Sequence, residues 1–198
     1  MTLSLLFSLV ACSPETSPED TSDSAQDSSE ASISSPQFVP YAEDGESVEN
    51  VDAPRYLGLW YEIATTPSQQ QSACAGTTAE YSLIDPDTIG VTNRCYIGGL
   101  DGRLNEIDAT ARPLDDSYAR LMVDFGFGFE APYTVVELLD SGEELYSHAV
   151  VRSSQVQYWI LSRTPEMPDE LYSSLLARIE DWGSDSSRLI KTEQPVTP

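Results

Sequence analysis

The sequence contains few cationic residues. Only 10 of its 198 residues are Lys or Arg, against 33 Asp and Glu, which gives a formal net charge of -23. Binding to nucleic acid requires a basic surface that displaces counterions from phosphate, so nucleic acid is excluded as a partner. Simple electrostatic adhesion to anionic lipid is disfavoured by the same charge.

Histidine and long apolar runs are scarce as well. His148 is the single histidine, so multi-histidine metal sites are excluded and any Ser-His-Asp mechanism would depend on this residue. No apolar run approaches the roughly 18 residues of a membrane-spanning helix. The sequence also has no Gly-x-Ser-x-Gly elbow, no His-Glu-x-x-His pair and no phosphate-binding Gly-Lys-Ser/Thr loop. We therefore expect no metal, no cofactor and no enzyme activity.

Cysteine is rare too, and the first of the three follows a short apolar stretch. Residues 1–12 read MTLSLLFSLVAC, and the last four of these resemble a bacterial lipobox. The resemblance implies a signal peptide over residues 1–11, cleavage before Cys12, and several acyl chains attached there, which suffice for stable anchoring. Ser13 after the cysteine favours sorting to the outer membrane. An ordinary secretory signal is the alternative.

An acidic, serine-rich segment comes next. Between Ser13 and Asn50, 10 residues are Ser, 10 are Asp or Glu, and none is Lys or Arg. Such a segment buries too little apolar surface to offset the entropy of ordering, so we expect a disordered linker over residues 12–50. A calcium-binding tract is the alternative, but the spacing of the acids matches no EF-hand loop.

The remaining two cysteines are Cys74 and Cys95. In an exported protein they allow a single pairing. A disulfide between them would close a loop of about twenty residues and contribute about 3 kcal/mol in the chain-entropy picture. Two free buried thiols are the alternative, and thiol titration of the unfolded, unreduced protein distinguishes the two.

Residues 51–198 have the pattern of an all-β domain. Short stretches rich in Val, Ile, Tyr, Thr and Leu alternate with turn residues such as Asp85-Pro86-Asp87, which favours antiparallel hairpins. Eight such strands can close into an up-and-down barrel that holds one small ligand. The expected strands are Gly58 to Thr65, Thr77 to Ile84, Ile89 to Ile97, Asn105 to Arg112, Ala119 to Phe125, Tyr133 to Leu139, Tyr146 to Arg152 and Val156 to Arg163.

One segment has helical periodicity instead. In residues 168–182, Leu171, Leu175, Ile179 and Trp182 recur at steps of four and three, which predicts an amphipathic helix that ends at Gly183. We expect its apolar stripe to pack on the outside of the barrel, and a partner-binding face is the alternative. A short strand over residues 188–193 is expected to return to the sheet.

Two strings at the ends of the domain carry a family resemblance. RYLGLWYEIA at residues 55–64 and YWILSRTP at residues 158–165 resemble the first-strand and last-strand signatures of the lipocalin family. Within it, the chain is similar to the bacterial outer-membrane lipoprotein type and to apolipoprotein D. The resemblance implies a barrel floor built from Gly58, Trp60 and Arg163, where a guanidinium stacked on an indole is favourable in its own right.

Strand alternation then assigns the inner face of the barrel. If Arg163 reaches Trp60 inside, alternate residues of each strand face the interior, while Tyr158 and Ile160 point outward to the helix. The resulting apolar calyx suits a long-chain lipid. Its expected lining residues are Glu62, Ala64, Tyr81, Leu83, Leu121, Val123, Phe125, Trp159 and Leu161.

The function that the resemblance implies is that of a carrier of fatty acids or lysophospholipids for envelope maintenance or lipid transport. We expect a monomer or weak homodimer, anchored through Cys12 in the outer membrane and facing the periplasm. The alternatives are a lipid isomerase or hydrolase on the same barrel, for which His148 would be required, and a structural lipoprotein whose barrel holds no ligand.

Overall fold

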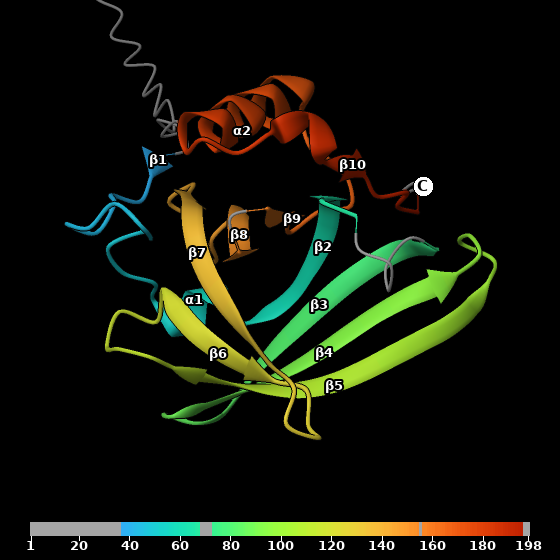
Figure 1. Ribbon diagram of the computed structural model, residues 1–198, viewed down its shortest axis with the longest axis horizontal. Coiled ribbons are helices and arrows are strands. Elements are labelled where there is room, and N and C mark those ends of the chain that lie inside the picture. The colour runs from blue at the N-terminus through green and yellow to red at the C-terminus, as the bar shows by residue number, and fades with distance from the viewer. Residues whose placement is uncertain (1–36, 68–72, 155, 196–198) are drawn as a thin grey trace, which may run out of the picture. The chain divides into compact units, whose positions relative to one another are not determined.

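The computed structural model describes residues 37–67, 73–154 and 156–195. Within these ranges, eight successive antiparallel strands curve into a barrel (Figure 1). They are β2 (Gly58–Thr65), β3 (Cys74–Asp85), β4 (Thr88–Ile97), β5 (Arg103–Pro113), β6 (Arg120–Asp124), β7 (Glu130–Asp140), β8 (His148–Ser154) and β9 (Gln157–Ser162).

The sheet closes on itself. Each strand from β2 to β8 pairs with the strand that follows it, and β9 also pairs with β2, where Tyr61 lies opposite Ser162. Closure removes the exposed edges that an open sheet would present. The predicted eight-stranded up-and-down barrel is therefore confirmed, and the expected strand ends differ by only a few residues.

The turns form through the residues that the sequence singles out. The Asp85 carboxylate accepts a hydrogen bond from the backbone N–H of Asp87 at 2.9 Å, which reverses the chain between β3 and β4. Between β4 and β5, Gly98 and Gly99 have φ angles of 92° and 124°, in the left-handed region that favours glycine. Local turn chemistry thus sets the register of neighbouring strands.

Helix α2 (Asp169–Asp181) packs against the outside of the barrel, as the periodicity predicts (Figure 1). Leu175 and Ile179 are fully buried against the outward side chains of Tyr158 and Ile160. A polar contact adds to this interface, because Arg178 Nε donates to the buried Glu137 carboxylate of β7 at 2.5 Å. The apolar stripe of the helix is therefore a packing surface.

Residues 37–50 also pack on the barrel, which differs from the linker expected over residues 12–50. Strand β1 (Gln37–Phe38) pairs with β7, the Tyr41 hydroxyl donates to Glu137, and Val48 is fully buried. Averaged over residues 12–50, the composition predicts disorder. The few large apolar side chains of the segment, however, are concentrated in residues 37–50, next to the barrel. The folded region thus extends to at least Gln37.

The C-terminal residues fill a gap between β2 and β3. These strands pair only from Gly58 to Tyr61, and farther along β2 pairs instead with β10 (Ile190–Lys191). The backbone N–H of Gly76 in β3 then donates to the carbonyl of Glu193 at 2.6 Å. The short connecting elements are α1 (Ala53–Tyr56) and the 3-10 helix η1 (Ser186–Arg188).

Candidate ligand-binding calyx

The barrel floor is formed by Trp60 of β2 and Arg163, which follows β9. Trp60 is fully buried, and the Arg163 guanidinium lies 3.8 Å from the centroid of its ring. The guanidinium also donates to the carbonyls of Tyr146, Leu59, Arg55 and Tyr56 at 2.8–3.1 Å. Burial lowers the pKa of Arg163 to about 10, so it remains a cation at neutral pH. The floor signature thus has the geometry that the sequence implies.

Gly58 belongs to the floor for a backbone reason. Its φ angle is 88°, and a Cβ atom there would lie 3.6 Å from Arg163 Nη1. The left-handed conformation is costly for residues that carry a Cβ. Glycine therefore lets β2 begin directly under the guanidinium.

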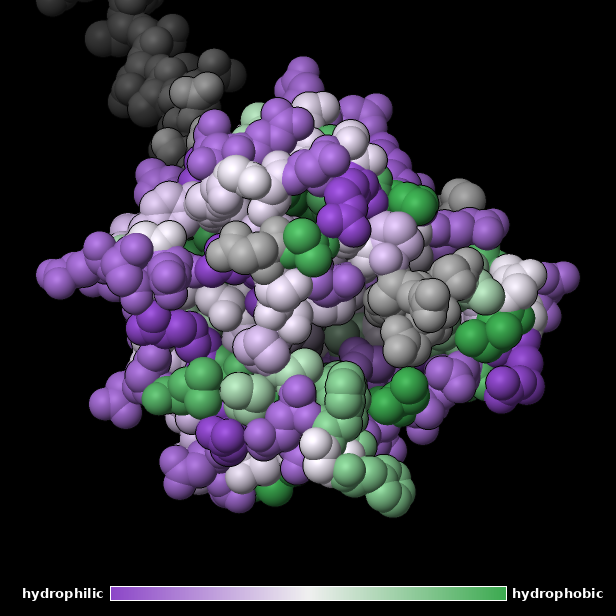
Figure 2. Space-filling view, viewed as in Figure 1, coloured by the Kyte–Doolittle hydropathy of each residue, from purple (hydrophilic) through white to green (hydrophobic). Residues whose placement is uncertain are grey.

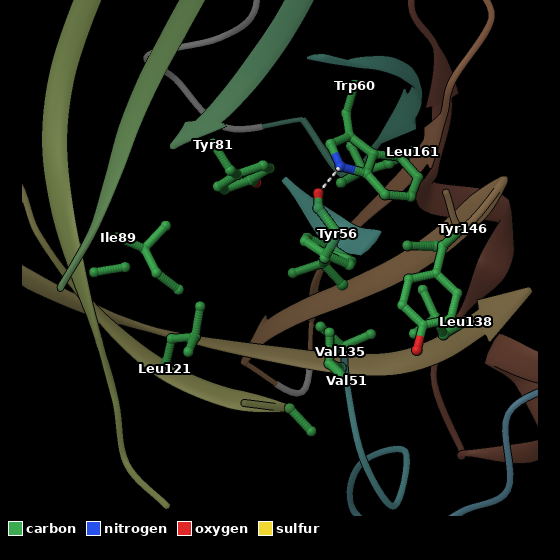
Figure 3. Packing of buried hydrophobic residues seen from close by; sticks show 14 of the residues in the cluster. Val51, Tyr56, Trp60, Tyr81, Ile89, Leu121, Val135, Leu138, Tyr146 and Leu161 are labelled. Carbon is green, nitrogen blue, oxygen red and sulfur yellow. Dashed lines mark hydrogen bonds between the residues drawn. The ribbon is translucent and has the colours of Figure 1, made fainter. Parts of the chain in front are cut away.

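Three tyrosines form a hydrogen-bonded chain above the floor. The Tyr133 hydroxyl lies 2.7 Å from that of Tyr56 and 2.9 Å from that of Tyr81 (the surrounding core is shown in Figure 3). Burial raises the pKa of all three hydroxyls, that of Tyr81 to about 12, so each stays protonated at neutral pH. Three O–H groups with two mutual hydrogen bonds leave one donor for another acceptor. Sequence reasoning identified Tyr81 but not Tyr56 or Tyr133.

An apolar cavity of about 570 Å³ lies above the tyrosines. Six of the expected lining residues face it, namely Glu62, Tyr81, Val123, Phe125, Trp159 and Leu161. The cavity lies within the range of volumes typical of small-molecule sites. Figure 2 shows one face of the molecule, where green apolar side chains gather beside a hollow while purple polar side chains cover most of the remaining surface. The cavity thus suits a small hydrophobic ligand.

Three expected lining residues lie elsewhere. A register shift in β2 between Glu62 and Ala64 turns Ala64 outward, where it packs in the cluster beneath α2. Leu83 is 48% exposed, because β2 begins opposite Tyr81 and the end of β3 extends past the floor. Leu121 does face inward, but it lines a separate small void of about 20 Å³ below the tyrosines.

Sequence reasoning missed most of the wall formed by β3, β4, β5 and the β6–β7 connection. The alternation that places Tyr81 inside also predicts Ala79, and the same argument applied to β4 would have found Asn93 and Val91. Tyr81 fixes the inner face of β3, but the sequence assigns no residue of β4 or β5 to a face, so their lining residues are not predicted. The missed lining residues include Thr77, Ala79, Val91, Asn93, Asn105, Ile107, Phe129, Ala131, Tyr133 and Val151.

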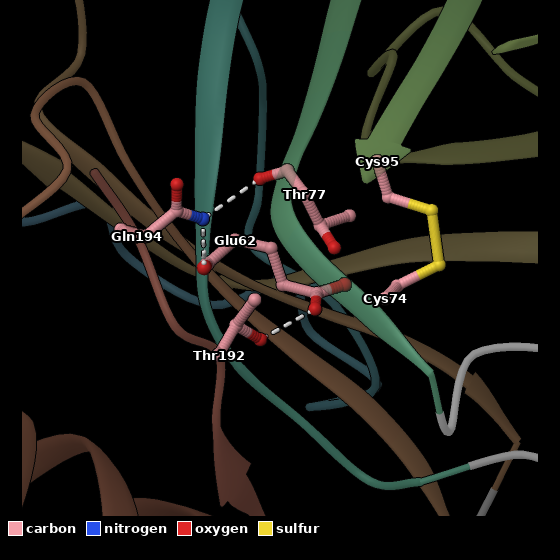
Figure 4. Close-up of a disulfide and its surroundings, with 6 residues drawn as sticks. All are labelled: Glu62, Cys74, Thr77, Cys95, Thr192 and Gln194. Atoms are coloured by element: carbon pink, nitrogen blue, oxygen red, sulfur yellow. Dashed lines mark hydrogen bonds between the residues drawn. A yellow bond between two sulfur atoms is a disulfide. The ribbon is translucent and has the colours of Figure 1, made fainter. Parts of the chain in front are cut away.

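The Cys74–Cys95 disulfide is present and lines the calyx wall (Figure 4). It joins the start of β3 to β4, with the two Cα atoms 5.4 Å apart. The bond lies next to the region where β3 no longer pairs with β2. It therefore restrains a wall that lacks one of its neighbouring strands.

Glu62 is the acidic residue of the calyx wall. Its side chain is buried, and the Thr192 hydroxyl donates to Glu62 Oε1 at 2.6 Å (Figure 4). Burial raises the pKa of Glu62 to about 7, although the hydrogen bond from Thr192 opposes this rise. The carboxyl group therefore titrates near neutrality inside an apolar cavity.

Other candidate sites have less structural support. His148 lies at the start of β8, where its Nδ1 is 3.0 Å from Ser147 Oγ, and it is not among the residues that line the calyx. The described residues contain no cluster of three or more His, Cys, Asp or Glu able to hold a metal ion. In the same ranges, no helix is long and apolar enough to cross a membrane. Cys12 lies outside the described residues.

Comparisons with known proteins agree with this geometry. A family model described as a lipocalin-like domain matches residues 51–194. The chain is 37% identical over 153 residues to a putative lipocalin of Acanthamoeba polyphaga mimivirus, covering 73% of this chain and 86% of that protein. It is 36% identical over 149 residues to the outer membrane lipoprotein Blc of Citrobacter freundii, covering 75% and 82%. Apolipoprotein D of Mus musculus is 30% identical over 162 residues, covering 76% and 80%.

Solved structures share the fold at lower sequence identity. Insecticyanin of Manduca sexta superposes with a TM-score of 0.63 at 20% identity, covering 80% of this chain and 89% of that chain. A lobster apocrustacyanin gives a TM-score of 0.54 at 20% identity, covering 73% and 81%. Together with the floor signature and the closed barrel, the sequence matches show that this chain belongs to the lipocalin family.

Proposed function

We propose that this protein is a lipid-anchored carrier that binds one single-chain lipid, such as a fatty acid or lysophospholipid, in its calyx for envelope maintenance or lipid transport. The observation that carries the proposal is the cavity of about 570 Å³, whose walls are mostly apolar. A packed barrel without a ligand would leave no such space. The polar groups that face it, mainly tyrosine hydroxyls, amides and Glu62, are few enough to orient a ligand without excluding a hydrocarbon chain.

The anchor is proposed from the sequence of residues 1–12. Acylation at Cys12 would hold the acidic domain at a membrane through hydrocarbon rather than charge. The similarity to outer membrane lipoproteins supports attachment to that membrane, and we propose that the domain faces the periplasm. We expect Cys12→Ser to release the protein into soluble fractions, and unchanged membrane retention would contradict the anchor.

One test of the carrier function is mass spectrometry of lipids that remain bound through purification of the full chain carrying Cys12→Ser. This substitution removes the attached acyl chains, which could otherwise enter the calyx. A second variant, Ala131→Trp, places an indole in the cavity and serves as the matched control. We expect stoichiometric single-chain lipid in the first protein and a strong reduction in the second, with the same far-UV circular dichroism. If both proteins retain only trace amounts of lipid, the result would contradict the proposal.

The enzymatic alternative depends on His148. Because this residue does not line the calyx, no described contact connects it to a ligand there. The carrier is therefore the function that the geometry supports best.

A further inference from the structure

The calyx wall contains an acidic group, Glu62, that has no salt-bridge partner among the described residues. Glu62 is 5% exposed, and among the described residues its hydrogen-bond donor is the Thr192 hydroxyl. An ionised carboxylate offers about four acceptor positions, so most of them remain unused. Burying such a group without a cation is costly, and the cost falls when a ligand supplies the missing charge.

The positive charges near Glu62 are directed elsewhere. Arg94 is the one Lys or Arg among the described lining residues, and its guanidinium bonds Glu80 and Glu106 at 2.7 Å each. On the C-terminal segment, Lys191 bonds Asp169 of α2, and Glu193 is exposed. On β9, the lining residues nearest in register are uncharged. Within the described residues, neither of these cations is paired with the Glu62 carboxylate.

A second polar group lies on the same wall. The Thr77 hydroxyl oxygen is buried and has no hydrogen-bond partner among the described residues. Figure 4 shows Thr77 and Thr192 on either side of the Glu62 side chain, which projects from β2 where β3 has separated from it. Thr77 and Glu62 both line the calyx. A buried polar group without a partner needs a hydrogen bond from another group, and because Thr77 lines the calyx a bound ligand can supply one.

From this arrangement we propose that Glu62 and Thr77 form a subsite for the protonated primary amine of a single-chain lipid. An ammonium group has three N–H donors, enough to bond both the free Glu62 carboxylate oxygen and the Thr77 hydroxyl. The hydrocarbon chain then occupies the apolar remainder of the calyx between Val123, Phe125 and Trp159. A carboxylate head group at the same place would meet like charge without a cation to offset it. The inference depends on the proposed lipid-carrier function and specifies the head group that it selects.

The subsite also links binding to pH. Since burial raises the pKa of Glu62 to about 7, the carboxyl must lose its proton before it can pair with an ammonium. Affinity for an amine should therefore rise with pH by up to about tenfold per unit below pH 7 and level off above it. Because a bound ammonium stabilises the carboxylate, binding near neutral pH should also release protons to the buffer.

The test measures displacement of the neutral fluorophore N-phenylnaphthylamine from the full chain carrying Cys12→Ser, by hexadecylamine, hexadecanol and hexadecanoic acid in turn. Between about pH 5.5 and about pH 8.5 we expect affinity for the amine to rise at least about tenfold, while affinity for the alcohol changes little. Glu62→Gln should abolish the rise and leave alcohol binding intact. Glu193→Gln removes the same charge from an exposed side chain of the C-terminal segment and should behave like the unsubstituted protein.

The outcomes separate the two proposals. If the alcohol and the acid displace the fluorophore but amine affinity is independent of both pH and Glu62, the amine subsite is wrong and the lipid carrier stands. If the fluorophore does not bind, or none of the three lipids displaces it from the folded protein, the lipid-carrier function itself fails. A rise in amine affinity that persists in Glu62→Gln would also overturn the subsite, because another group would be responsible.

Discussion

The Arg163 guanidinium lies 3.8 Å from the ring centroid of Trp60, so a residue after the last barrel strand closes the floor over a residue of the first. The stack is partly desolvated, which strengthens a cation-π contact. Four backbone carbonyls also accept hydrogen bonds from the same guanidinium. One side chain therefore ties together the two strands that close the barrel and the segment that precedes β2.

Replacing Arg163 tests that role. We expect Arg163→Ala to lower the free energy of unfolding by about 3 kcal/mol, because it removes the stack and leaves buried carbonyls without donors. Arg163→Lys should recover little of this, since an ammonium lacks the planar fork that reaches several carbonyls together. Urea unfolding followed by circular dichroism measures both. Arg103→Ala, at an exposed position at the start of β5, is the control, and an equal loss there would argue against a special role.

Val48 tests whether residues 37–50 belong to the folded domain. Its side chain is fully buried in the inner cluster, and its backbone N–H donates to the Val135 carbonyl at 3.0 Å. We expect Val48→Ala to destabilise the protein by about 2 kcal/mol through lost burial and the cavity it leaves. Val156→Ala removes the same atoms at a side chain that is 55% exposed and should cost little. Equal urea midpoints for the two variants would indicate that residues 37–50 belong to the linker and not to the folded domain.

Glu62 predicts how stability depends on pH. Its pKa in the folded state is about 7, above the ordinary 4.5, so the folded protein binds this proton more tightly than the unfolded chain does. Its ionisation therefore costs stability progressively as pH rises from about 4.5 to about 7, by up to about 3 kcal/mol, and the cost is constant above that range. We compare the free energy of unfolding of Glu62→Gln with that of the unsubstituted chain at two pH values. Between pH 5 and pH 8 this difference should shift in favour of the variant by roughly this amount. Urea midpoints that shift equally at both pH values would disagree with the burial of this carboxyl.

The disulfide closes a loop with a sequence separation of 21. Removing it as Cys74→Ser with Cys95→Ser should lower the free energy of unfolding by about 3 kcal/mol, chiefly because the unfolded chain gains freedom. Reduction of the unsubstituted protein by dithiothreitol should lower the free energy of unfolding by a similar amount, which urea unfolding measures. The double variant should then be insensitive to the reductant, and a variant that still responds would implicate a different thiol.

The sequence predicts the barrel well because strand alternation, turn residues and two motifs agree with one another. Trp60 and Arg163 lie where the motifs imply, and Tyr158 and Ile160 face α2 as alternation requires. Alternation fails at Ala64, because a register shift is a property of strand pairing that no local pattern reveals.

Two further differences have related causes. The exposure of Leu83 follows from where β2 begins relative to β3, which is a long-range relation between strands. Residues 37–50 are ordered because they pack against the barrel and form hydrogen bonds with its backbone. Amino-acid composition does not describe such contacts between segments. The local elements are thus encoded nearby in the sequence, whereas the outline of the calyx depends on contacts between distant segments.

The central claim is that the calyx holds a single-chain lipid, and displacement of the neutral fluorophore N-phenylnaphthylamine tests it most directly. The full chain carrying Cys12→Ser is titrated with the fluorophore and then with unlabelled lipid, beside the same chain carrying Ala131→Trp. We expect saturable one-to-one binding in the first protein and a loss of at least about tenfold in affinity in the second, where an indole occupies part of the cavity. Absence of saturable binding in the first protein, with circular dichroism showing a folded barrel, would contradict the claim.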